Sequence, residues 1–199
     1  MRYGYFTRKA RAIVQKWGRR EDKAALWDNE FRSGQWEYLK HSGKDFVYPV
    51  LEKYLNGGTL LDFGCGNGNT SMELDSEAYE RYLGLDISPV AIEQCNKRSE
   101  SEGRSDKNEY IVDTIEGFVT NDRFDVVLFR ESLFYVTLFR IPGAIRKARS
   151  LLKPGGVMVI RLCSEKKYRP LITMVGWFGD IVERIRPDEP KGAVALVVK

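Results

Sequence analysis

Three glycines alternate with other residues where the segment Leu60-Leu61-Asp62-Phe63-Gly64-Cys65-Gly66-Asn67-Gly68 ends. Glycine has no Cβ, so the backbone at these positions can turn tightly and approach a ligand closely. The segment leaves a short apolar run, residues 59–63, and opens a helix, which is where ligands bind in an α/β fold. The pattern therefore predicts a binding loop that contains Asp62, Gly64, Cys65, Gly66 and Asn67.

Two further aspartates follow apolar runs. Asp86 lies 22 residues after Gly64 and ends the run 81–85. A carboxylate there can accept hydrogen bonds from both hydroxyls of a ribose, whereas the alternative role is an acid at a helix N-terminus. Asp113 ends the run 109–112, where it suits the exocyclic amine of adenine or caps a loop. With the glycine loop, these positions favour an adenosine-containing cofactor.

Candidates for a general base are few. His41 is the only histidine, and Glu131 and Tyr135 follow the fourth apolar run, residues 124–129. Carboxylate, imidazole and phenol groups can all move a proton when a substrate lies within hydrogen-bond reach. Arg130 and Arg161 end runs on the same side, where they either hold an acidic acceptor or pair with nearby carboxylates. The residue types leave all three candidate bases open.

These residues share one site only if the apolar runs are neighbouring parallel strands. Helical segments are expected at 45–55, at 89–102 after the N-cap Ser88, and at 144–152. A fifth strand is expected at 157–162, and strands at 181–186 and 192–198 are close enough to form an antiparallel hairpin. This alternation predicts an α/β fold whose mostly parallel sheet carries helices on both faces, with ligands at the carboxyl ends of the strands.

The run LLDFGCGNG, with GLDIS at 84–88, Asp113, FDVVLF at 124–129 and LLKPGGVMVI at 151–160, resembles the class I S-adenosylmethionine-dependent methyltransferases over roughly residues 45–199. The resemblance implies a Rossmann-like three-layer sandwich with a seven-stranded sheet of order 3-2-1-4-5-7-6, in which strand 7 is antiparallel. It also implies S-adenosylmethionine as cofactor and S-adenosylhomocysteine as product.

The resemblance also assigns roles to residues. Asp62 and the glycine loop would contact the methionine half of the cofactor, and Arg130 would lie beneath it. Asp86 with Ile87 would bind the ribose, and Asp113 with Thr114 the adenine end. Glu131 and Tyr135 would face the methyl acceptor.

The segment 27–36 looks like the N-terminal lid of small-molecule methyltransferases. Trp27, Phe31 and Trp36 would close over the cofactor, exclude water and face the sulfonium with aromatic rings, although core packing is the alternative role. We therefore divide the chain into a basic arm with lid helices, residues 1–44, and a cofactor-binding methyltransferase domain, residues 45–199.

Charge is uneven along the chain. The first 20 residues hold seven Lys or Arg and no acid, which leaves 25 basic against 28 acidic residues in the remainder. The main domain therefore lacks the basic excess of a nucleic-acid binder. Residues 5–17 place apolar and basic residues on opposite faces of a helix. That helix packs on the domain, contacts an acidic substrate, an acidic partner or an anionic membrane, or belongs to a cleaved transit peptide.

Length and cysteine content give the remaining expectations. A chain of 199 residues predicts one main domain, as a monomer or homodimer. The three cysteines are far apart and have no metal-ligand spacing, so no metal and a cytoplasmic location are expected. No apolar run approaches the ~20 residues that a membrane span needs.

The expected function is transfer of the methyl group of S-adenosylmethionine to an oxygen or nitrogen of a small-molecule acceptor, glycans and natural products included, by in-line displacement. Asn69 stands where a nicotinamide-binding loop would have its third glycine. The loop 130–135 lacks the Asn/Asp-Pro-Pro-aromatic run of enzymes that modify bases. A protein or nucleic-acid methyltransferase and a non-catalytic cofactor-binding module remain as alternatives, and the acceptor stays open.

Overall fold

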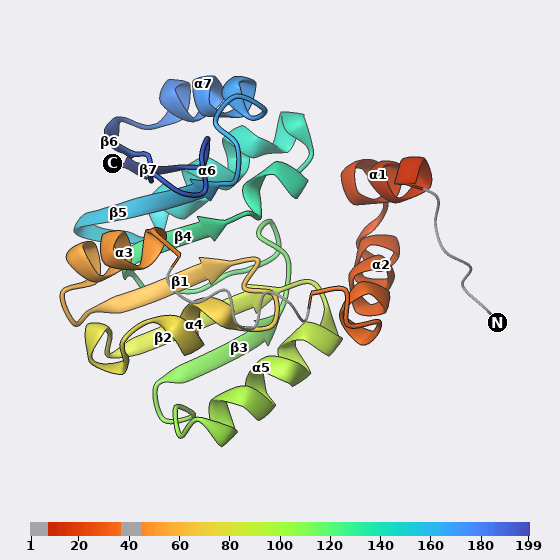
Figure 1. Ribbon diagram of the computed structural model, residues 1–199, viewed down its shortest axis with the longest axis horizontal. Coiled ribbons are helices and arrows are strands. Elements are labelled where there is room, and N and C mark those ends of the chain that lie inside the picture. The colour runs from red at the N-terminus through yellow and green to blue at the C-terminus, as the bar shows by residue number, and fades with distance from the viewer. Residues whose placement is uncertain (1–7, 37–44) are drawn as a thin grey trace.

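The computed structural model describes residues 8–36 and 45–199, with side chains from residue 10 onward. Its centre is a sheet of strands in the order β3-β2-β1-β4-β5-β7-β6 (Figure 1). Strands β1 to β5 pair in parallel, and β7 lies antiparallel between β5 and β6. The predicted fold class and strand order are confirmed. The strands are β1 (Thr59–Phe63), β2 (Arg81–Asp86), β3 (Asn108–Val112), β4 (Phe124–Arg130), β5 (Leu152–Leu162), β6 (Ile181–Ile185) and β7 (Val194–Val198).

Position in the sheet explains the composition of the strands. Every residue of β1 and of β7 is buried, and both read as nearly continuous apolar runs, as strands covered on both faces do. The edge strand β6 alternates half-buried and exposed residues instead. The strand order reverses between β1 and β4, and ligands of doubly wound sheets bind beyond the strand ends at such a point.

Helices cover both faces of the sheet and make it the middle of three layers. One buried cluster joins the sheet to Ile145 of α6 and Val175 of α7. The other joins it to Leu51 of α3 and Ile92 of α5. These helices are α3 (Val47–Leu55), α5 (Pro89–Ser101), α6 (Ile141–Ser150) and α7 (Arg169–Phe178), with the short α4 (Asn69–Glu73) after the glycine loop.

Some predicted bounds need correction. Strand β5 begins at Leu152 rather than Val157, because Leu152 already pairs with Phe124 of β4. Helix α6 begins at Ile141 rather than Ala144, with a proline in its first turn. Helix α7 was not predicted at all.

Two N-terminal helices, α1 (Arg8–Trp17) and α2 (Arg20–Arg32), lie beyond the carboxyl ends of the strands (Figure 1). Arg11 of α1 donates two hydrogen bonds, of 2.5 and 2.8 Å, to the buried carboxylate of Glu30 in α2. Asp28 of α2 accepts hydrogen bonds from the Ser88 hydroxyl (2.5 Å) and the Val90 amide (3.2 Å). Helix α2 is therefore anchored at the N-terminus of α5. Among the helices described, none combines the length and apolarity needed to cross a bilayer.

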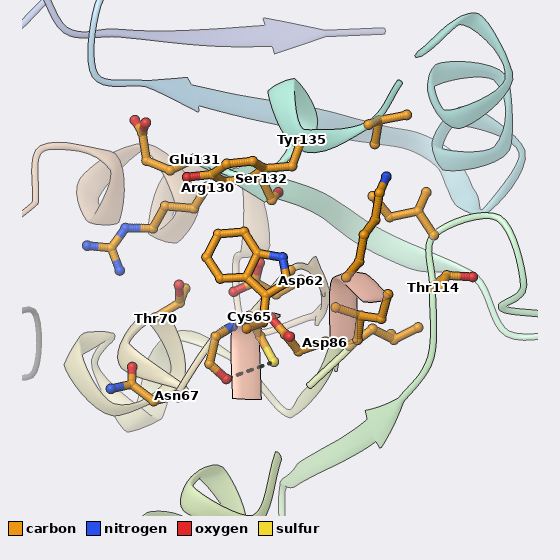
Figure 2. Close-up of a pocket in the computed structure, with 18 of the residues that line it drawn as sticks. Asp62, Cys65, Asn67, Thr70, Asp86, Thr114, Arg130, Glu131, Ser132 and Tyr135 are labelled. Carbon is orange, nitrogen blue, oxygen red and sulfur yellow. Dashed lines mark hydrogen bonds between the residues drawn. The ribbon is translucent and has the colours of Figure 1, made fainter. Parts of the chain in front are cut away.

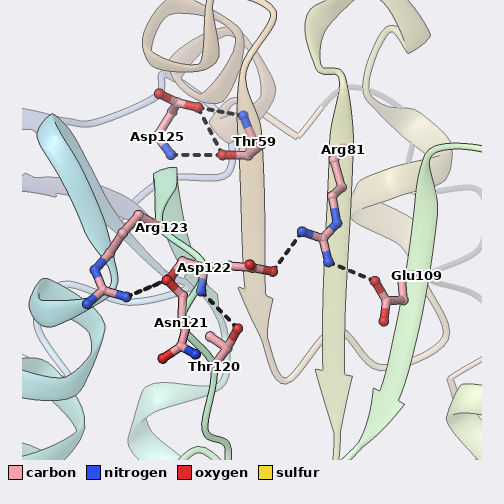
Figure 3. A network of polar contacts seen from close by, with 8 residues as sticks. All are labelled: Thr59, Arg81, Glu109, Thr120, Asn121, Asp122, Arg123 and Asp125. Atoms are coloured by element: carbon pink, nitrogen blue, oxygen red, sulfur yellow. Dashed lines mark hydrogen bonds and ion pairs between the residues drawn. The ribbon is translucent and has the colours of Figure 1, made fainter.

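A polar network lies at the opposite end of the sheet, where the parallel strands begin (Figure 3). Asp125 accepts hydrogen bonds from the Thr59 amide (2.7 Å) and hydroxyl (2.9 Å), and Lys153 lies 2.7 Å from the same carboxylate oxygen. Arg81 of β2 bridges Asp122 (2.8 Å) and Glu109 (2.9 Å). These contacts tie the starts of the strands together, far from the ends where ligands bind.

Candidate functional site

A cavity of about 700 Å³ opens beyond the carboxyl ends of the central strands, beneath α2 (Figure 2). Every described residue predicted for the cofactor or for catalysis lines this single cavity. His41 lies outside the described part of the chain. The lining residues that the sequence singled out are Trp27, Phe31, Trp36, Asp62, Gly64, Cys65, Gly66, Asn67, Asp86, Ile87, Asp113, Thr114, Arg130, Glu131 and Tyr135. Their roles remain predictions.

The glycine loop needs its glycines for two reasons. Gly64 has φ +82°, and a Cβ added there would lie 2.5 Å from the Ser132 Cβ in the loop after β4. The amides of Gly64 and Cys65 both donate to the Leu85 carbonyl, at 2.8 and 2.9 Å. On its other side the loop faces α2, since a Cβ on Gly66 would lie 3.6 Å from the Phe31 ring. The loop is thus held between two elements, and at Gly64 it has no room for a side chain.

Asp62 is buried and lines the cavity with one oxygen unpaired. Its Oδ2 accepts a hydrogen bond of 2.8 Å from the Tyr82 hydroxyl, while its Oδ1 has no partner among the described residues. Burial raises the pKa of Asp62 to about 6. An unsatisfied buried acceptor is unfavourable, so this oxygen suits a ligand that brings a hydrogen-bond donor, above all a cationic one.

Asp86 ends β2 next to the glycine loop. Its Oδ2 accepts from the Gly66 amide (3.0 Å) and its Oδ1 from the Ser88 amide (2.9 Å). Burial raises the pKa of Asp86 to about 6. Because each carboxylate oxygen has two lone pairs, the fixed group can still accept hydrogen bonds from a diol such as ribose.

Asp113 and Thr114 form the turn that follows β3. Asp113 Oδ1 accepts from the Thr114 amide at 2.7 Å, so the loop-capping role considered for this aspartate is present. The same oxygen lies 3.4 Å from Nη2 of Arg20, which α2 brings across the cavity. This end of the cavity is therefore fixed by its own loop and by the N-terminal helices together.

Four charged side chains form a compact cluster on the opposite wall. Arg130 lies 3.0 Å and Arg161 3.2 Å from Asp45 Oδ2, and Arg161 also forms an ion pair with Glu131. Glu131 has a left-handed backbone with φ +57°, and its amide donates to the Arg161 carbonyl at 3.1 Å. Of the two roles considered for these arginines, the structure shows pairing with carboxylates. The cluster carries no net charge.

Aromatic rings from α2 meet the loop after β4 over the cavity. Trp27 contacts Tyr135 edge-on, with ring centroids 4.8 Å apart, and lies 6.1 Å from Trp36. Burial raises the pKa of Tyr135 to about 12, so its hydroxyl remains protonated near neutral pH and can donate a hydrogen bond. The part of the chain that the structure describes holds no cluster of metal-binding side chains.

Comparison with known proteins identifies the family. A family model described as a methyltransferase domain matches residues 55–184. The chain belongs to this family. S-adenosylmethionine is the cofactor of the class I enzymes in it, which confirms the predicted cofactor at the level of the family.

Curated relatives of this methyltransferase domain have different acceptors in their names. The chain is 32% identical over 125 residues to the ribosomal protein L11 methyltransferase of Tolumonas auensis. This match covers 62% of the chain and 40% of that protein. The chain is 33% identical over 119 residues to the ubiquinone biosynthesis O-methyltransferase of Methylobacterium sp., covering 59% of this chain and 45% of that protein. The chain thus spans less than half the length of these relatives.

Solved structures support the fold. The N-methyltransferase NodS of Bradyrhizobium japonicum superposes with a TM-score of 0.63 at 20% identity, covering 77% of this chain and 93% of that one. The NodS complex with S-adenosylhomocysteine superposes with a TM-score of 0.59.

Several residues that line the cavity of this methyltransferase domain were not predicted as site residues. Asp45, at the start of the predicted helix 45–55, suggested only a helix cap; the N-cap of α3 is Phe46, and Asp45 lies just before it and accepts from the Val47 amide at 3.2 Å. Its pairing with Arg130 joins positions 85 apart in the sequence. Arg20 was one of the basic arm residues, and nothing local pointed to Ser132. Such contacts depend on which loops the topology brings together, so local patterns could not reveal them.

Proposed function

We propose that this methyltransferase domain binds S-adenosylmethionine in the cavity beneath α2 and transfers its methyl group to an oxygen or nitrogen of a small-molecule acceptor. The observation that carries the proposal is the unpaired Oδ1 of buried Asp62, beside a glycine loop in which Gly64 leaves no room for a side chain. This oxygen fits the ammonium group of the methionine moiety. Asp86 fits the ribose hydroxyls, and Asp113 with Thr114 fits the adenine end.

The cavity has a suitable size for this task. Small-molecule sites occupy about 300–1,000 Å³, and the cavity of about 700 Å³ lies within that range. Helix α2 covers it with Trp27 and Phe31, and the turn after α2 adds Trp36. A covered cavity of this size favours a small acceptor over a folded protein or a structured RNA.

The residues of the chain would act mainly by positioning. S-adenosylmethionine supplies a methyl group that its sulfonium already activates. The aromatic rings of Trp27 and Trp36 exclude water from the cavity and stabilise a nearby positive charge. Holding an acceptor in line with the bond to be broken can contribute about 7–11 kcal/mol to the rate enhancement.

The proton chemistry depends on the acceptor, because a base is needed only for a hydroxyl or a protonated amine. Glu131, which forms an ion pair with Arg161, would be the general base. It would take up a proton released by the acceptor. Tyr135 would donate a hydrogen bond that orients the acceptor. His41 remains a predicted candidate base.

A thermal-unfolding experiment with S-adenosylhomocysteine tests cofactor binding. Ligand at ~100 times its dissociation constant stabilises the wild type by about 2.7 kcal/mol, which raises the Tm by several degrees. We expect Asp86→Asn to lose most of this shift and the control Asp122→Asn, at the far end of the sheet, to keep it. No wild-type shift at millimolar ligand would refute the proposal.

The acceptor class needs a separate assay. Radiolabelled S-adenosylmethionine is incubated with the enzyme and a cell extract, and label is measured in the small-molecule, protein and RNA fractions. We expect label in the small-molecule fraction, and less of it with Glu131→Gln. Label that accumulates in protein or RNA instead would exclude a small-molecule acceptor.

A further inference from the structure

Helix α1 turns large apolar side chains away from the protein. Ile13 is 61% exposed, Trp17 60%, Leu138 49% and Phe139 68%; we call these four residues the α1–η4 patch, after α1 and the 3-10 helix η4 (Leu138–Arg140). Ile13 and Trp17 are one helical turn apart, so they share a face of α1. One expectation was that the apolar face of this helix packs on the domain. Ile13 and Trp17, the two largest apolar residues described on that face, are exposed instead.

Contacts between α1 and η4 make the patch continuous. The rings of Trp17 and Phe139 lie 6.0 Å apart between centroids. The Thr137 hydroxyl donates to the Lys16 carbonyl at 2.8 Å, which fixes the end of α1 against the start of η4. The patch is therefore a built surface composed of two segments that are far apart in the sequence.

Positive charge surrounds this surface. Lys16 Nζ lies 6.0 Å from the centre of the Trp17 ring, and Arg19 is largely exposed beyond the end of α1, with Asp22 3.6 Å away. Arg140 ends η4 next to Phe139, with Glu116 3.7 Å away. The first 20 residues hold seven basic and no acidic side chains, against an acidic excess in the remainder. Among the described residues, exposed basic side chains thus border the apolar patch.

We propose that the α1–η4 patch docks on the surface of an anionic lipid bilayer. Trp17 and Phe139, with Ile13 and Leu138, would enter the boundary between headgroups and acyl chains. Lys16 and Arg19 would remain among the lipid phosphates. An interfacial helix that combines bulky apolar residues with Lys and Arg binds anionic membranes in this way.

The composition of the patch favours a bilayer over other partners. Aliphatic side chains such as Ile13 and Leu138 gain free energy on leaving water, but a nucleic-acid backbone offers them no apolar environment. A symmetric contact between two copies would bring both cationic segments together, which like-charge repulsion opposes. Membrane docking does not depend on the proposed methyl transfer, because none of the four patch residues lines the cavity.

The test is co-sedimentation of the full chain with vesicles of phosphatidylcholine, with and without about one-third phosphatidylglycerol. We expect binding to the anionic vesicles that weakens as salt is raised. Trp17→Ala should lower the partition coefficient by about tenfold. The control Trp177→Ala, which removes a tryptophan that is 72% exposed on α7, should leave it unchanged.

A second pair of variants separates charge from apolar contact. Replacing Lys16 and Arg19 together by Gln should lower binding to anionic vesicles roughly 30-fold. Replacing Lys166 and Lys191 together by Gln, at exposed sites before α7 and before β7, is the matched control. Phe139→Ala, with exposed Val119→Ala as its control, tests the other half of the patch.

Three results would overturn the proposal. In the first, the wild type remains in the supernatant in the presence of anionic vesicles. Trp17→Ala and Trp177→Ala could reduce binding equally, so that no particular surface is involved. Sedimentation velocity without lipid could show a dimer that Trp17→Ala dissociates, which would make the patch an interface between copies.

Discussion

The carboxyl groups of Asp62 and Asp86 lie at the ends of neighbouring strands, where burial raises the pKa of each from the usual 3.8 to about 6. Between pH 3.8 and about pH 6, both carboxyl groups are largely protonated in the folded protein but ionised in the unfolded chain. These groups therefore contribute stability that is fully present below about pH 4 and is lost as the pH rises through about 6. Binding of a cationic or diol ligand has the opposite dependence, because it requires the ionised carboxylates.

The first prediction concerns Asp62. We expect Asp62→Asn to weaken S-adenosylhomocysteine binding by roughly 10- to 100-fold at pH 7, because a charge-assisted hydrogen bond to the ligand is lost. In the wild type, affinity should fall as the pH decreases through about 6. Isothermal titration calorimetry between pH 5 and pH 8 measures both effects. In the Asn variant, only the part of the pH dependence due to Asp86 should remain, and an unchanged profile would contradict the assignment.

Gly64 provides the second prediction. Ala at Gly64 meets a positive φ and a Cβ contact of 2.5 Å with Ser132, whereas Ala at Gly57 meets only a positive φ of +79° with nothing within 4 Å. We expect a loss of about 1 kcal/mol in the free energy of unfolding for Gly57→Ala and about 2–4 kcal/mol for Gly64→Ala. Urea unfolding measures the difference. Equal losses would show that the loop after β4 can move aside.

At the scale of elements, α2 connects regions that the sequence separates widely. Arg20 contacts Asp113, Asp28 contacts Ser88, and Trp27 contacts Tyr135. The helix therefore touches the segments that follow β2, β3 and β4 and covers the cavity between them. Its position, rather than its composition, connects the N-terminal segment to the site.

The anchoring of α2 gives the third prediction. Asp28→Ala removes the acceptor for Ser88 and Val90, two hydrogen bonds worth about 0.5–1.5 kcal/mol each. We expect amide hydrogen exchange in Arg20–Arg32 to accelerate by about tenfold and affinity for S-adenosylhomocysteine to fall a few-fold. Glu21→Ala, in the exposed first turn of the same helix, should change neither quantity.

Most strand bounds were predictable because they follow from local patterns, whereas the strand order came from the resemblance to class I methyltransferases. The buried strands β1 and β7 read as apolar runs, and short turns with Gly and Pro separate the elements. Helix α7 escaped prediction because its apolar side, with Leu171 and Val175, becomes evident only against the core cluster it joins. The glycine loop and the three strand-end aspartates were predictable for the same local reason, whereas the Asp45 cluster was not.

Over the whole molecule, the two ends of the sheet respond differently to acid. Burial acts to raise the pKa of Asp125, but Lys153 and Thr59 outweigh it and hold this pKa below the usual 3.8. A lowered pKa contributes stability that is present above about pH 4 and is lost as the pH falls through the folded value. Acid therefore weakens the end where the strands begin, whereas protonation of Asp62 and Asp86 stabilises the cavity end.

The fourth prediction concerns Asp125, at the end of the sheet where the strands begin. Asp125→Ala should lower the free energy of unfolding by about 1–3 kcal/mol, or roughly 2–4 °C of Tm per kcal/mol, without changing affinity for S-adenosylhomocysteine. Asp122→Ala, whose partner Arg81 is partly exposed, should cost about 0–1 kcal/mol. Urea unfolding at pH 7 and pH 3 provides the measurement. The difference between wild type and Asp125→Ala should shrink at pH 3.

The antiparallel strand β7 also dictates an order of events during protein synthesis. It pairs with both β5 and β6, yet it leaves the ribosome after both of them. Until it arrives, β5 presents an open edge with buried-type residues such as Val157 and Val159, and such edges recruit other strands. At about 5–20 residues per second, this interval lasts a few seconds. The nascent chain is therefore most prone to aggregation just before its sheet closes, which is when a chaperone would have the most effect.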